Sequence, residues 1–158
     1  MTPAQRKAAA LSLATALAIP AEGLRQYAYR DVTGLPTICF GSTAGVKMSD
    51  FRTVPECKAL LTKEMYATIS TVDSCRPGLP INVLAAFSDA AYNIGEHIAC
   101  DSSKSTAARL LAAGRYAEAC EQLPRWNRAK VAGVSVELPG LTRRREMEQQ
   151  VCLAGVTQ

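Results

Sequence analysis

The sequence has 158 residues, of which 48% are hydrophobic and 20% are charged. This balance excludes a disordered or fibrous protein, and the length suffices for one good core or for two small lobes that share a helix. The formal net charge of +4 is too small to indicate a nucleic-acid partner, although it would help the protein approach an anionic polymer.

The chain opens with a short apolar segment. Arg6 and Lys7 precede residues 8–19, which are small or apolar except for two hydroxyl residues, and the segment ends at Pro20. These twelve residues fall short of the roughly 20 that a helix needs to span a bilayer. Two interpretations remain open: the hydrophobic part of an export signal without a clear cleavage site, or an alanine-rich first helix that packs on the core.

Glu22 and Gly23 mark the first clear helix end. Glycine after an apolar run suits the left-handed position that follows a helix, which places Glu22 in the last helical turn. The negative end of the helix dipole lies there and opposes ionisation of a carboxyl group. A glutamate that stays protonated near neutral pH can act as a general acid, so Glu22 is a candidate proton donor.

A small β-hairpin follows. Residues 27–30 and 35–40 are rich in aromatic, β-branched and apolar side chains, and they flank a four-residue turn that begins at Asp31. Thr37 lies on the returning strand. Residues 41–45 indicate further loop, which leads into another short strand or an irregular connection.

Two strong helix patterns come next. Thr53 and Glu56 form a capping box, which opens an amphipathic helix. Its apolar stripe, at spacings of three and four, comprises Cys57, Leu60, Leu61, Met65, Ile69 and Val72. Residues 73–80 break this helix. Residues 81–94 are apolar almost all round, so we expect the buried central helix there, closed by Gly95.

Three later helices are expected, with breaks at Gly114 and Pro124: residues 105–113, 117–123 and 141–153. The predicted fold class is therefore α+β and mainly α-helical, with a small hairpin lobe followed by a helical lobe. A cleft between two lobes is a natural ligand site.

Six cysteines are spread along the chain: Cys39, Cys57, Cys75, Cys100, Cys120 and Cys152. They contain no CxxC pair, which disfavours a zinc ribbon or a thioredoxin-like redox site. An even number in a short chain favours disulfides and an oxidising compartment, whereas six reduced, buried thiols are the alternative. Fifteen pairings are open, and the spacing does not rank them.

The sequence around Glu22 resembles the sequences of a known protein family. The segments EGLR at 22–25, YAYRD at 27–31 and GLPTICFG at 34–41 are similar to the catalytic block of glycoside hydrolase family 24. This family comprises the phage-type lysozymes, or endolysins.

The resemblance continues in the same order along the chain. ECKALL at 56–61 resembles the family's first helix after the hairpin, and YNIG at 92–95 resembles the end of its central helix. GLTRRR at 140–145, with Glu148 and Cys152, resembles the C-terminal signature of the cysteine-containing lambdoid branch.

The resemblance implies a fold and an activity. The fold is lysozyme-like and two-lobed, with a small β-hairpin lobe and a helical lobe joined by a long helix. One catalytic domain would cover residues 1–158, with residues 1–20 as its apolar N-terminal segment. The activity is hydrolysis of the β-1,4 bonds between N-acetylmuramic acid and N-acetylglucosamine in peptidoglycan, with inversion, host cell lysis and no metal or other cofactor.

The resemblance aligns three residues of this sequence with the catalytic residues of the family. Glu22 matches the family's general acid, Asp31 matches its general base or charge stabiliser, and Thr37 matches the residue that helps to place the attacking water. Two carboxyl groups with separated pKa values supply the proton donor and the basic partner that glycoside hydrolysis needs.

Two further residues are candidates for substrate binding, Asn93 and Arg144. Asn93 would hydrogen-bond an acetamido sugar or the peptide stem, or it is an ordinary asparagine at a helix end. Arg144 matches a family arginine that reaches back across the cleft to the catalytic glutamate. Arg143 or Arg145 takes that role if the alignment slips by one, and otherwise the three arginines form a solvated face.

Three features depart from the family or are left without a role. Ser42 stands where many relatives have histidine, so we expect the pairing of that histidine to be absent. His97 lies in a presumed loop, and we assign it no role. Cys39, inside the catalytic block, is a redox switch in one interpretation and a core or disulfide cysteine in the other.

Partners and location follow from the resemblance. We expect a monomer that is made in the cytoplasm of the host bacterium, acts in the periplasm on glycan strands, binds no nucleic acid and associates transiently with the inner membrane through its N-terminus. Three alternatives remain: a lytic transglycosylase, an inactive cell-wall-binding module and a membrane-disrupting cationic protein.

Overall fold

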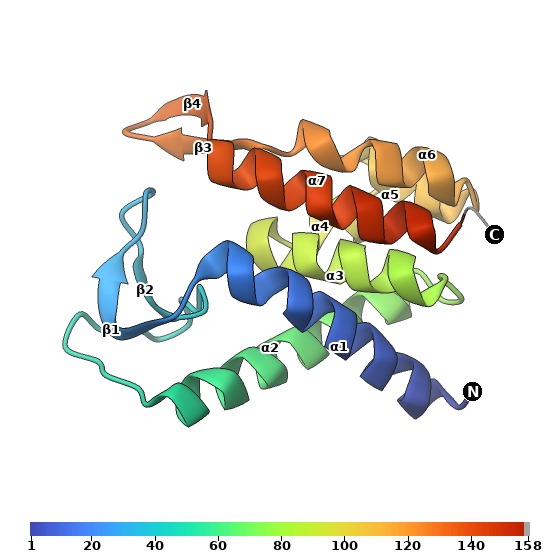
Figure 1. Ribbon diagram of the computed structural model, residues 1–158. Helices are drawn as coiled ribbons and strands as arrows, with labels where there is room; N and C mark the ends of the chain where they lie inside the picture. Colours follow the sequence, from blue (N-terminus) through green and yellow to red (C-terminus); the bar gives the residue numbers. More distant parts are fainter. Residues whose placement is uncertain (157–158) are drawn as a thin grey trace.

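The computed structural model describes residues 1–156, and they form a helical body with two small antiparallel hairpins at one end (Figure 1). The helices are α1 Pro3–Glu22, α2 Val54–Cys75, α3 Ile81–Ile94, α4 His97–Cys100, α5 Thr106–Ala112, α6 Tyr116–Glu121 and α7 Pro139–Ala154, with a 3₁₀ turn at Leu123–Arg125. The strands are β1 Arg25–Arg30, β2 Pro36–Cys39, β3 Arg128–Val131 and β4 Val134–Glu137.

Helix α1 contains the N-terminal apolar segment. It begins earlier than the apolar pattern indicated, because Thr2 caps it in a capping box. Pro20 lies inside its last turns rather than at its end, and the helix closes at Glu22, as predicted, with Gly23 following at a φ of +69°. The segment packs as the first helix of the fold, and its buried side chains are Ala10, Ala14, Leu17 and Ala18.

The predicted hairpin is formed by β1 and β2, with Tyr29 opposite Thr37. The connection after β2 is irregular, as expected, but one antiparallel bridge within it sets Phe51 beside Tyr27 on the other edge of β1. Ile38 on β2 belongs to the hydrophobic core, and Ala28 on β1 packs against this core. Both strands therefore attach the hairpin lobe to the rest of the protein.

Helix α3 is the centre of the helical lobe, as predicted. Its residues 83–91 are all buried, and α1, α2 and α7 pack against it. Helix α2 has 22 residues and runs from beside the hairpin lobe along the helical body, so it joins the two lobes (Figure 1). It extends to Cys75, past the break expected at residue 73. The predicted α+β class and two-lobed, lysozyme-like form are confirmed.

Helices α5, α6 and α7 agree with prediction to within two residues. The short helix α4 and the 3₁₀ turn after α6 were not predicted. Sequence reasoning missed the hairpin of β3 and β4, because both strands have four residues and are largely exposed, so they lack a core-facing run. Their turn places Ala132 and Gly133 at φ of +50° and +80°. An Ala-Gly turn is a weaker hairpin signal than Asn-Gly, and Gly133 between two valine-containing runs was the only hint.

The six cysteines form three disulfides, so the alternative of reduced, buried thiols is wrong. Cys39–Cys57 ties β2 to α2, and this pairing replaces the interpretation of Cys39 as a free redox switch. The other two bonds tie α2 to α4 and α6 to α7, through Cys75–Cys100 and Cys120–Cys152.

Across residues 1–156, no helix is both long enough and apolar enough to cross a membrane. The same residues contain no group of three His, Cys, Asp or Glu side chains that could hold a metal ion.

Candidate active site

The fold brings the three predicted catalytic residues to one cavity of about 360 Å³. Glu22 ends α1, Asp31 directly follows β1, and Thr37 lies on β2. The first hairpin forms one wall of the cavity. The end of α3, the second hairpin and the start of α7 supply the rest, through Tyr92, Asn93, Arg128, Ala129, Leu138 and Leu141.

Glu22 sits against the loop after β2. A Cβ atom on Gly41 would lie 2.6 Å from Glu22 Oε2, and Gly41 has a φ of +83°. Only glycine fits there without moving the carboxyl group or straining the backbone. The other oxygen, Oε1, accepts a hydrogen bond from Arg144 Nη1, which leaves Oε2 as the oxygen that can carry a proton.

Arg144 is the arginine that reaches Glu22, so the alignment does not slip by one. It is buried, and its Nε and Nη2 also donate to the two carboxylate oxygens of Asp89, at 3.0 and 2.7 Å. Burial alone would lower the pKa of Arg144, but the Asp89 and Glu22 carboxylates outweigh it and raise this pKa. Arg145 is also buried and only Arg143 is exposed, so the interpretation as a solvated face is wrong.

Asp89 was missed by sequence reasoning. It is fully buried on the apolar helix α3, beneath the guanidinium of Arg144. A single carboxylate in an otherwise apolar helix was the available signal, because a buried charge needs a partner.

Arg144→Met is expected to destabilise the fold by about 3–5 kcal/mol, because Asp89 is left as an uncompensated buried charge. Urea unfolding monitored by circular dichroism measures the change in the free energy of unfolding. Arg143→Met removes the same charge from the neighbouring exposed position and should change it by less than about 0.5 kcal/mol. Equal losses in the two variants would contradict this account of Asp89.

Asp31 is held by the turn that it begins. Its Oδ1 accepts hydrogen bonds from the Thr33 hydroxyl at 2.6 Å, the Thr33 amide at 2.8 Å and the Leu35 amide at 3.0 Å. Partial burial alone would raise the pKa of Asp31, but these hydrogen bonds outweigh it and lower this pKa. Asp31 is therefore a carboxylate at neutral pH. The same side chain stabilises the turn and lines the cavity.

Thr37 is buried, and its hydroxyl donates to the carbonyl oxygen of Leu35 at 2.9 Å. A hydroxyl has one donor hydrogen and two acceptor lone pairs, so Oγ1 can still accept a hydrogen bond.

Asn93 lines the same cavity, and a hydrogen bond from Arg145 sets the orientation of its side-chain amide. Its Oδ1 accepts a hydrogen bond from Arg145 Nη2 at 2.9 Å, and the same nitrogen donates to Glu148 Oε1 at 2.8 Å. The amide nitrogen of Asn93 is therefore the end available to a ligand as a donor.

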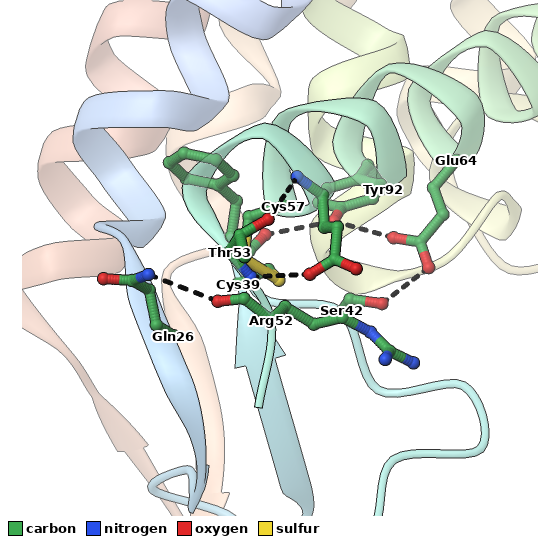
Figure 2. Close-up of a disulfide and its surroundings, with 10 residues drawn as sticks. Gln26, Cys39, Ser42, Arg52, Thr53, Cys57, Glu64 and Tyr92 are labelled. Atoms are coloured by element: carbon green, nitrogen blue, oxygen red, sulfur yellow. Dashed lines mark hydrogen bonds between the residues drawn. A yellow bond between two sulfur atoms is a disulfide. The ribbon is translucent and has the colours of Figure 1, made fainter. Parts of the chain in front are cut away.

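Ser42, where we expected the pairing of a family histidine to be absent, has a hydrogen-bond partner of its own. Its hydroxyl donates to Glu64 Oε1 at 2.6 Å, and the Tyr92 hydroxyl donates to Glu64 Oε2 at 3.1 Å (Figure 2). Burial and the adjacent Glu64 carboxylate raise the pKa of Tyr92, so its hydroxyl stays protonated. The serine hydroxyl at position 42 is therefore hydrogen-bonded, although no histidine is present there.

His97 lies at the start of α4 rather than in a loop. Its ring packs near Trp126, with 5.4 Å between ring centroids, and it is not among the residues that line the cavity with Glu22.

The chain is similar to known proteins over most of its length. A family model described as phage lysozyme matches residues 20–148. A SAR-endolysin of Pseudomonas phage phiKMV is 37% identical over 148 residues, which cover 93% of this chain and 90% of that protein.

Solved structures share the fold. The active form of the P1 phage endolysin Lyz superposes with a TM-score of 0.77 at 24% identity, over 92% of this chain and 85% of that chain. The muramidase domain of SpmX from Asticaccaulis excentricus superposes with a TM-score of 0.74 at 27% identity, over 92% and 95% of the two chains.

Proposed function

Because this chain belongs to the phage lysozyme family and is a peptidoglycan-lysing endolysin with glycoside hydrolase activity, we propose that Glu22, Asp31 and Thr37 carry out its reaction. The bond cleaved is the β-1,4 link between N-acetylmuramic acid and N-acetylglucosamine. One observation carries the proposal: Glu22 and Asp31, the two carboxyl groups that acid–base hydrolysis of a glycoside requires, line the same cavity as the Thr37 hydroxyl.

The reaction uses each group once. Glu22 donates a proton to the departing glycosidic oxygen as the carbon–oxygen bond breaks and positive charge develops on the anomeric carbon. A water molecule attacks that carbon from the opposite face and passes a proton to Asp31. Thr37 Oγ1, whose own hydrogen goes to Leu35, accepts the second hydrogen of this water. The product is inverted, and proton exchange with solvent resets both carboxyl groups.

Two predicted substrate-binding residues take different roles in this proposal. Asn93 donates its amide hydrogens to an acetamido or peptide carbonyl oxygen, because Arg145 occupies its own oxygen. Arg144 is almost fully covered and orients the Glu22 carboxyl group, so we propose that it acts as a positioning residue rather than by touching the glycan.

Product analysis tests the reaction. Mass spectrometry of purified sacculi digested with the protein should find reducing N-acetylmuramic acid ends, which carry one added water per bond cleaved. A lytic transglycosylase would leave anhydromuramic ends instead and would tolerate Asp31→Asn. Anhydro products, or full activity of Asp31→Asn, would therefore overturn the proposed hydrolysis.

The pH profile tests the role of Asp31. Its lowered pKa keeps the carboxylate ionised as the pH falls, so kcat/KM should persist to a pH below the usual range of an aspartate. Thr33→Val removes one of the hydrogen bonds that lower this pKa, so the acid limb should move to higher pH. Thr33→Ser keeps the hydroxyl and should keep the profile. An unmoved acid limb in Thr33→Val would count against Asp31 as the base.

We further propose where the protein works and with what. It is made in the host cytoplasm as a monomer and acts in the periplasm, where an oxidising environment allows the three disulfides to form. Its partner is the glycan strand and not nucleic acid, and α1 associates transiently with the inner membrane. The mass and sedimentation of protein recovered from the periplasm would test processing of α1 and the monomeric state.

A further inference from the structure

An exposed aromatic pair lies on the hairpin lobe, outside the catalytic cavity. Tyr27 is 72% exposed and Phe51 is 45% exposed, and their ring centroids are 4.8 Å apart with the planes tilted by 52°. Neither residue belongs to the hydrophobic core. Single exposed apolar residues are normal on a surface, but these two large rings contact each other and lie outside the core, so core packing does not explain them.

The backbone holds this pair in place. The Ala28 amide donates to the Asp50 carbonyl at 3.0 Å, and the Arg52 amide donates to the Gln26 carbonyl at 2.9 Å. The Gln26 side chain adds a hydrogen bond to the Arg52 carbonyl at 3.3 Å (Figure 2). Residues 50–52 thus act as a third strand on β1, and Phe51 is fixed next to Tyr27 before any ligand binds.

The pair lies near the catalytic cavity along β1. Ala28 packs against the core, and Tyr27 and Tyr29 are its two neighbours on β1. Tyr29 lines the cavity, and the Arg25 guanidinium lies 4.5 Å over the Tyr29 ring. Two residues of strand span about 7 Å at most, so Tyr27 lies within about that distance, along β1, of a residue that lines the cavity.

We propose that Tyr27 and Phe51 form a platform that binds the glycan strand of peptidoglycan where it leaves the catalytic cavity. This inference rests on the proposed function, since the polymer cleaved in the cavity must continue beyond it. Sugar rings present apolar faces to aromatic rings. The exposed side chains of Arg52, which follows Phe51 in the chain, and of Arg25, which lies over Tyr29, provide positive charge for the carboxylates of the peptide stems.

The platform predicts a preference for polymer over fragments. In Tyr27→Ala/Phe51→Ala, the ratio of kcat/KM for intact sacculi to kcat/KM for a soluble fragment of two disaccharides should fall about tenfold, which corresponds to about 1.4 kcal/mol from two aromatic contacts. The loss should appear in KM for sacculi. Tyr27→Phe keeps the ring and should keep the ratio.

Tyr66→Ala is the matched control. Tyr66 is also 45% exposed, but it lies on α2 and does not line the catalytic cavity. It should leave the ratio unchanged. An unchanged ratio in the double variant, or an equal fall in Tyr66→Ala, would overturn the platform.

Binding measured without turnover separates this inference from the proposed chemistry. In the Glu22→Gln background, co-sedimentation with sacculi should show a Kd about tenfold higher when Tyr27 and Phe51 are also alanine. Equal Kd values would overturn the platform even if the assignment of Glu22 holds. If the substitutions instead abolish binding to vesicles of anionic phospholipid and leave binding to sacculi intact, the pair is a membrane contact and the proposal is wrong.

Discussion

Glu22→Gln is expected to reduce lysis of permeabilised Gram-negative cells by about 10³-fold or more, because an amide has the shape of the acid but cannot donate its proton to the leaving oxygen. The fold should survive, since Arg144 keeps both hydrogen bonds to Asp89. The fall in turbidity with time measures lysis, and thermal unfolding checks the fold.

Glu146→Gln is the control for Glu22→Gln. Glu146 is an exposed carboxylate on α7, so its loss should leave the lysis rate unchanged. Equal lysis by wild type and Glu22→Gln would contradict the acid role and revive the non-enzymatic alternatives. The structure already weakens the membrane-disrupting alternative, because Arg144 and Arg145 lie in buried ion pairs rather than on a cationic surface.

Reduction of the three disulfides is expected to unfold the protein or to lower its melting temperature by more than about 10 °C. The bonds close loops with sequence separations of 18, 25 and 32 residues. Chain-entropy arguments give each about 3 kcal/mol of stabilisation. Together they are comparable to the whole stability of a typical domain, which is about 5–15 kcal/mol.

Calorimetry with and without reductant measures this effect, and mass spectrometry supplies the control. Alkylation should add nothing to the mass of the unreduced protein and six groups after reduction. The double variant Cys120→Ala/Cys152→Ala should lose about 3 kcal/mol by itself. An unchanged melting temperature in protein that carries all six groups would show that the bonds do not support the fold.

The family and the main elements were accessible from sequence. Capping residues and three-to-four spacing predicted α2, and the apolar run between Pro80 and Gly95 predicted α3 within its observed bounds. Glu22 was correctly expected at a helix end and Asp31 and Thr37 on the following hairpin. These features are local, because helix and turn hydrogen bonds join residues only a few positions apart, and the order of the motifs then indicated the phage lysozyme family.

The missing parts of the site are those that join distant segments. Arg144 and Glu22 are 122 positions apart, and no local pattern predicted that the same guanidinium would also bind Asp89. The second hairpin, which closes the cavity with Arg128 and Ala129, escaped prediction because exposed strands carry no core-facing pattern.

The sequence by itself determined the longer helices, the first hairpin, the number of cysteines and the order of the proposed catalytic residues. Only the tertiary structure decided which of the fifteen cysteine pairings forms, which arginine meets Glu22, and where Phe51 lies relative to Tyr27. The reason is physical. Local hydrogen bonds and side-chain periodicity depend on neighbouring residues, whereas contacts between distant residues depend on how the helices and hairpins pack together.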